Sequence, residues 1–156
     1  MEASLQLYGL VFLLGSLTVA ALSDLRRMAA QKDFAEVWGV FAFVAVVFDA
    51  YMLSETEPLT LMLKFFLIAA FAYAALKEHA LNISLMDVSA VVAVASLLNP
   101  LEIIVFYTAV IVFRGLLSPM LSKFGGDSVK PFLPVVFSAT VLMVVISSYG
   151  GLTQLP

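Results

Sequence analysis

The stretch LQLYGLVFLLGSLTVAALS, residues 5–23, is an apolar run long enough to cross a lipid bilayer as a helix. A helix rises roughly 1.5 Å per residue, so about 20 apolar residues span the hydrocarbon core. Similar runs follow at residues 37–53, 59–76, 85–98, 101–117 and 131–148. Lipid offers no hydrogen-bond partners to an open backbone, so each run is expected to be helical. The pattern predicts an all-α, polytopic membrane protein with about six transmembrane helices.

The composition supports lipid as the solvent for much of this surface. The chain is 63% hydrophobic and 12% charged, whereas soluble domains are about half apolar and about a quarter charged. A chain of 156 residues cannot hide that much apolar surface from water by folding alone. The opening MEASLQ has no lysine or arginine, so the first run is expected to be a retained span rather than a signal peptide. No linker or repeat interrupts the chain, which predicts a single transmembrane domain over residues 1–156.

Several function classes are disfavoured by what the chain lacks. It has no cysteine, which excludes a disulfide framework, a thiol nucleophile and a thiolate metal site. His79 is the single histidine and argues against a polyhistidine metal centre. There is no basic patch with interleaved aromatic residues, so nucleic-acid binding is not expected.

The positive charges predict how the chain is oriented in the membrane. Most of them fall in the first, third and fifth predicted loops: Arg26, Arg27, Lys32, Lys77, Lys123 and Lys130. Arg114 lies near the same side, and Lys64 near the opposite one. The positive-inside rule therefore predicts a multi-pass protein of the cell membrane with these loops in the cytoplasm and both termini outside.

Two aspartates fall on the predicted cytoplasmic side, each where an apolar run meets water. Asp24 closes the first run and Asp87 begins the fourth. Taken singly, each is most simply a helix-end carboxylate that reaches water, and Asp87 would cap its helix together with Ser84. Taken together, two close carboxyls can hydrolyse a peptide, because mutual repulsion keeps one of them protonated. Such a pair titrates as a unit, so neither role is assigned to either residue.

Three stretches resemble the prepilin and preflagellin signal peptidases, a GxGD-type group of intramembrane aspartic proteases. ALSDLRRMAAQKDFAEVWGV has the family's aspartate at the end of helix one, followed by basic residues and an aromatic-led second helix. MDVSAVVAVASLLNP resembles the second aspartate motif of archaeal members, and VKPFLPVVFSA resembles the opening of the last helix. The separation between Asp24 and Asp87 is also similar to that in short archaeal members.

The resemblance implies an aspartic endopeptidase with Asp24 and Asp87 as catalytic residues. Its substrate would be the leader of a type IV pilin-like or archaellin-like precursor, cut on the cytoplasmic side of the membrane. The resemblance implies no metal and no organic cofactor. Membrane lipid is the other expected partner.

Two alternatives stay open at the second aspartate. The family's glycines before it are replaced by Ser84, Leu85 and Met86, which favours a noncatalytic member acting as a membrane scaffold or binding partner. Asp127, in KFGGDSVK, is a rival second aspartate, although Gly-Gly-Asp is also an ordinary turn. An unrelated transporter or channel ranks last, since few ionisable residues fall near mid-membrane.

Three further expectations concern residues away from this pair. Asp49 lies near the outer end of the second run, where it is expected to reach the interface or to pair with Lys64. Trp38 is expected, with the tyrosines, in the interfacial aromatic belt. Pro119 is expected at the edge of a segment.

Overall fold

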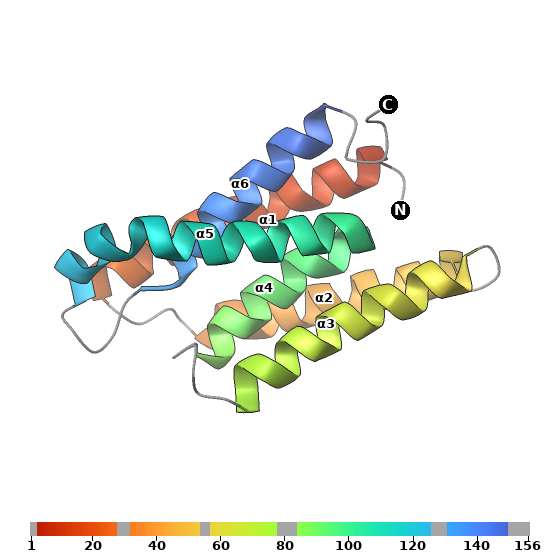
Figure 1. Cartoon of the computed structure of the whole chain (residues 1–156), viewed down its shortest axis with the longest axis horizontal. Coiled ribbons are helices and arrows are strands. Elements are labelled where there is room, and N and C mark those ends of the chain that lie inside the picture. Colours follow the sequence, from red (N-terminus) through yellow and green to blue (C-terminus); the bar gives the residue numbers. More distant parts are fainter. Residues whose placement is uncertain (1–2, 28–31, 54–56, 78–83, 126–130, 150–156) are drawn as a thin grey trace.

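The computed structural model is a bundle of six helices (Figure 1). It describes residues 3–27, 32–53, 57–77, 84–125 and 131–149, and within these ranges every regular element is helical. The helices are α1 (Ala3–Arg27), α2 (Lys32–Leu53), α3 (Pro58–Lys77), α4 (Leu85–Leu97), α5 (Pro100–Gly125) and α6 (Leu133–Ser148). The predicted all-α fold is therefore confirmed.

Each predicted apolar run forms one helix, but the six helices differ in length. Four helices, α1, α2, α3 and α5, are long and apolar enough to cross a membrane, judged by length and composition. Helices α4 and α6 have 13 and 16 residues. At roughly 1.5 Å per residue they fall short of a hydrocarbon core of about 30 Å. The chain forms the six predicted helices, and within the described ranges four of them meet the length of a full span.

The short helix α4 occupies the centre of the bundle. It packs extensively against α2 and also contacts α1, α3 and α6. Helices α1 and α6 form the other large contact, and α5 packs against α6 (Figure 1). Nearly all of α4 is buried from Asp87 to Leu97. This explains why its sequence is apolar all round rather than striped, as expected for a helix enclosed by neighbours.

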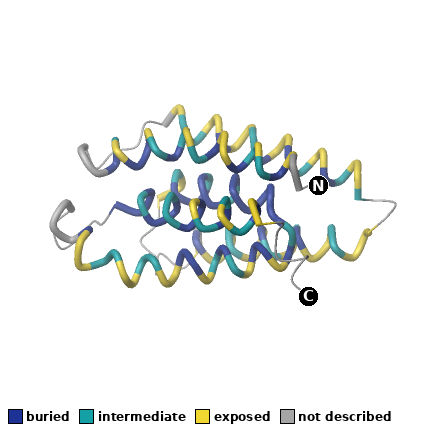
Figure 2. The backbone as a smooth tube through the Cα atoms, turned by 90° about the horizontal axis from the view of Figure 1, so that it is seen from above, coloured by how far each residue is buried: buried dark blue, intermediate teal, exposed yellow. Residues whose placement is uncertain are grey.

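The outer surface of the bundle is also apolar. Figure 2 shows exposed residues along the outward sides of the helices and buried residues facing inward. Large apolar side chains lie exposed on several helices, among them Phe12, Val19, Phe43, Tyr51, Phe66 and Leu116. Apolar surface on this scale suits contact with lipid chains rather than with water.

Among the described residues, the prolines lie at or near helix starts except for Pro119. Pro58 and Pro100 open α3 and α5, at the first helical position, where proline costs no backbone hydrogen bond. Pro119 lies inside α5, which continues to Gly125. The expectation that Pro119 lies at the edge of a segment is therefore wrong. An interior proline removes one backbone donor, and α5 continues beyond this loss.

A buried polar network ties helices together at the end of the bundle where α4 stops and α5 begins. Lys64 of α3 forms an ion pair with Asp49 of α2 and donates a hydrogen bond of 2.7 Å to the carbonyl of Ser96 in α4. Glu102 of α5 accepts a 2.5 Å hydrogen bond from Nε2 of Gln6 in α1. The expected Asp49–Lys64 pair is confirmed. Asp49 is only 1% exposed, so the alternative that it reaches the interface is wrong.

Trp38 belongs to the core rather than to the interfacial belt. Its side chain is fully buried, and its indole Nε1 donates a 3.0 Å hydrogen bond to Oγ of Ser16 in α1. The ring also packs against Phe34, with 5.7 Å between ring centroids. The belt prediction is wrong for Trp38, because Ser16 supplies the polar partner that buried indoles need.

Candidate active site

Asp87 lies in the first turn of α4 and takes part in a capping box. Its Oδ2 accepts hydrogen bonds from Ser84 N at 2.9 Å and Ser84 Oγ at 2.8 Å. In return, Asp87 N donates to Ser84 Oγ at 3.2 Å. The sequence predicts this role, since a carboxylate in the first turn satisfies free N–H groups and favours the positive end of the helix. The capping box uses Oδ2 alone and therefore fixes the carboxyl without engaging Oδ1.

Asp24 lies near the end of α1 and reaches the start of α6. Its Oδ2 accepts a 3.4 Å hydrogen bond from the backbone N–H of Leu133, the first residue of α6. The residue that precedes the helix, Phe132, makes no side-chain capping bond. Asp24 therefore supplies, from another helix, one of the acceptors that a helix N-terminus requires. Pro134, at the second position of α6, has no N–H to satisfy.

The fold brings these two aspartates to the same end of the bundle. Helices α1 and α4 are in contact, and each aspartate is 9% exposed. Asp87 belongs to α4, which is not one of the four helices long enough to span a membrane. Burial raises the pKa of its carboxyl; the hydrogen bonds from Ser84 oppose this, and the charge of Asp24 acts in the same direction as burial. The charge of Asp24 is therefore one of the influences on the ionisation of Asp87.

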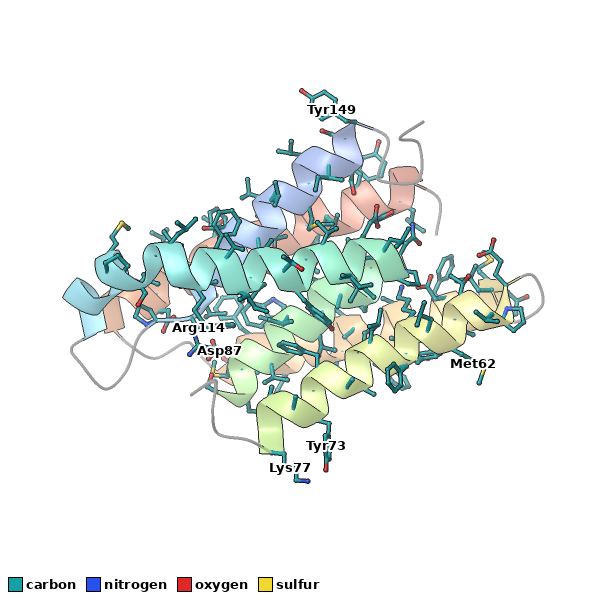
Figure 3. All side chains as sticks on the ribbon, viewed as in Figure 1. Met62, Tyr73, Lys77, Asp87, Arg114 and Tyr149 are labelled. Carbon is teal, nitrogen blue, oxygen red and sulfur yellow. The ribbon has the colours of Figure 1, made fainter. Side chains whose placement is uncertain are left out.

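Arg114 completes the site from a third helix. It lies in α5, its guanidinium carbon 5.7 Å from the centroid of the Phe132 ring, and its positive charge acts to lower the pKa of Asp87. Figure 3 shows Arg114 and Asp87 toward the same end of the bundle, on α5 and α4. In the sequence, Arg114 indicates only sidedness. The signal that points to a site is an arginine between apolar residues in the interior of α5.

The three stretches that carry the family resemblance converge at this site. Asp24 comes from the first, Asp87 from the second, and Phe132 and Leu133 from the third. Asp33, in the first stretch, is exposed at the start of α2. The rival Asp127 lies outside the described residues, as do the side chains of Arg26 and Arg27.

The chemistry available here is that of two carboxyls and a guanidinium. Within the described ranges, no group of three or more His, Cys, Asp or Glu side chains is placed to hold a metal ion. No protein-family model matches the chain, and no curated protein or solved structure is significantly similar to it. Function is therefore argued from the residues of the site and their geometry.

Proposed function

We propose that the chain is an intramembrane aspartic endopeptidase, with Asp24 and Asp87 as its catalytic pair. The observation that carries this proposal is the placement of two buried carboxyls, from the contacting helices α1 and α4, toward one end of an apolar helical bundle. One carboxyl would act as base on a water molecule while the other, protonated, polarises the scissile carbonyl. Like charges at close range favour such a singly protonated pair.

The proposed substrate is the leader of a type IV pilin-like or archaellin-like precursor. The family resemblance of the three converging stretches supports this substrate class. Such a substrate has an apolar segment that lies in lipid, and the bundle presents an apolar outer surface to the same lipid. Cleavage on the cytoplasmic side follows if the positive-inside rule sets the orientation.

The decisive experiment is cleavage of a pilin-like precursor in membranes that contain the full-length chain. Asp24→Asn and Asp87→Asn are each expected to reduce the rate about 100-fold or more, since each removes one proton-transfer group. Asp33→Asn is the matched control, because Asp33 is an exposed aspartate in the first family-like stretch. Normal cleavage by Asp87→Asn together with loss of cleavage by Asp127→Asn would move the second catalytic position to Asp127.

A noncatalytic scaffold is the alternative function, and one observation favours it. The capping box gives Asp87 a structural task that needs no catalysis, and the family's glycines are absent before it. On this alternative the wild type binds precursor peptides without turnover. Binding and cleavage should therefore be measured on the same preparation, and binding without cleavage across several leaders would replace the peptidase proposal.

A further inference from the structure

The two carboxyls of the proposed pair are held by unequal sets of hydrogen bonds. Each aspartate residue is 9% exposed. Asp87 Oδ2 accepts two hydrogen bonds from Ser84, at 2.8 and 2.9 Å. Asp24 Oδ2 accepts a longer one, from Leu133 N at 3.4 Å, and the backbone N–H of Phe132 also interacts with its carboxyl. Short hydrogen bonds to a carboxylate stabilise its ionised form, so these contacts favour charge on Asp87.

The helix termini add to this difference. Asp87 is the third residue of α4, at the positive end of the helix dipole. Asp24 lies in the last turn of α1, at the negative end, although it also meets the backbone N–H groups of Phe132 and Leu133 at the start of α6. A carboxylate is stabilised at a helix N-terminus and destabilised at a C-terminus. The position of α4 therefore favours an ionised Asp87 over an ionised Asp24.

The third contribution comes from Arg114. Among the described residues, the charged side chains that act on Asp87 are Asp24 from α1 and Arg114 from α5. The Arg114 guanidinium lies against the ring of Phe132, beside the residue that donates to Asp24. Arginine stays charged at all ordinary pH values, so it favours one negative charge in its neighbourhood. Arg114 thus promotes a singly ionised pair.

We propose that Asp87 is the ionised base of the pair, that Asp24 is its protonated acid, and that Ser84 and Arg114 are positioning residues. This assignment rests on the proposed peptidase function. Water attacks the carbonyl carbon and gives a proton to Asp87, while Asp24 gives its proton to the carbonyl oxygen. Asp87 then protonates the leaving nitrogen as the C–N bond breaks, and a hydroxyl of the tetrahedral intermediate returns a proton to Asp24.

The assignment makes a directional prediction for the pH dependence of cleavage. Ser84→Ala removes one hydrogen bond to the ionised base, so the acidic limb of the kcat/KM profile moves up by about one pH unit. At a fixed pH on that limb the rate falls about tenfold, while the alkaline limb stays in place. Ser84→Thr, which keeps the hydroxyl, restores the wild-type profile. Arg114→Gln moves the acidic limb in the same direction, and Arg114→Lys moves it less.

Ser89→Ala is the matched control, because Ser89 Oγ donates to the carbonyl of Met86 and not to Asp87. It should leave both limbs unchanged. Movement of the alkaline limb in Ser84→Ala would make Asp87 the acid and overturn the assignment. An unchanged profile in both Ser84→Ala and Arg114→Gln would overturn it as well.

Infrared difference spectroscopy of the full-length chain with ¹³C-carboxyl aspartate tests the same assignment without cleavage. Ser84→Ala is expected to shift an ionised carboxylate band and to leave the protonated carboxyl band in place. The reason is that Ser84 contacts Asp87 and not Asp24. Ser89→Ala should shift neither. If the protonated band shifts, or if neither band shifts, the assignment is overturned. A shifted carboxylate band in a chain that cleaves no precursor would retain the assignment and reject the peptidase.

Discussion

Lys64 of α3 and Asp49 of α2 form an ion pair inside the bundle, with 4% and 1% of these residues exposed. Lys64 also donates to the carbonyl of Ser96 in α4, so one ammonium group joins three helices. Of the six helices, α3 is among the least extensively packed. Directional polar contacts of this kind supplement van der Waals packing between helices in lipid.

Replacing Lys64 by methionine should therefore destabilise the chain strongly. Lys64→Met leaves Asp49 as a buried carboxylate without its cation, which costs about 3–5 kcal/mol in comparable cases. The double variant Asp49→Leu, Lys64→Met removes both charges and should recover most of the loss. The measurement is thermal unfolding of the purified protein in detergent.

Lys77→Met is the control, because Lys77 is exposed and donates to the hydroxyl of Tyr73. If Lys64→Met and Lys77→Met unfold at the same temperature, the ion pair does not hold α3.

The hydrogen bond between Trp38 and Ser16 gives a second prediction. Ser16→Ala leaves the indole N–H of Trp38 buried without its acceptor, at a cost of about 1–3 kcal/mol. Trp38 is the single tryptophan of the chain, so its fluorescence reports this site alone. The emission maximum is expected to move to shorter wavelength when the indole loses its polar partner.

The control for this prediction is Thr18→Val on the same helix. Thr18 Oγ1 donates to the carbonyl of Leu14 in its own helix and not to Trp38. Its emission maximum should match that of the wild type. An equal spectral shift in both variants would show that Trp38 responds to general loosening of α1.

Membrane orientation can be tested with single cysteines, since the natural chain contains none. Asp33 and Glu57 are exposed near opposite ends of α2. With the first loop in the cytoplasm, Glu57→Cys should react with a membrane-impermeant thiol reagent on intact cells. Asp33→Cys should react only after the membrane is opened. The reverse labelling pattern would invert the orientation and place the Asp24 end of the bundle outside.

The helices could be predicted from local sequence, because an apolar run in lipid has few alternatives to a helix. Each of the six predicted runs coincides with a helix, although α1, α2 and α5 extend several residues beyond the predicted edges. The cap of α4 was also readable, since Ser84 and Asp87 have the spacing of a capping box. These features depend on neighbours in the chain and on the solvent.

The partners of polar side chains were harder to predict from the sequence than the helices were. Asp49 and Lys64 could be suggested as a pair by their signs and depth, whereas Gln6 and Glu102 gave no signal. Trp38 looks like a belt residue until Ser16 is placed beside it by the contact between α1 and α2. Arg114 indicates sidedness in the sequence, whereas in the bundle it lies against Phe132, toward the same end as Asp87 (Figure 3).

By itself, the sequence determined that this chain forms six apolar helices with a carboxylate at the end of the first and another at the start of the fourth. Hydrophobic run length and helix capping are local properties, so they can be recognised without knowledge of the tertiary structure. Only the tertiary structure decided that α4 lies in the centre, that Asp24 meets the start of α6, and that Arg114 lies against Phe132. The physical reason is that lipid-facing and core-facing apolar residues are chemically alike, so their pattern does not encode which helices touch.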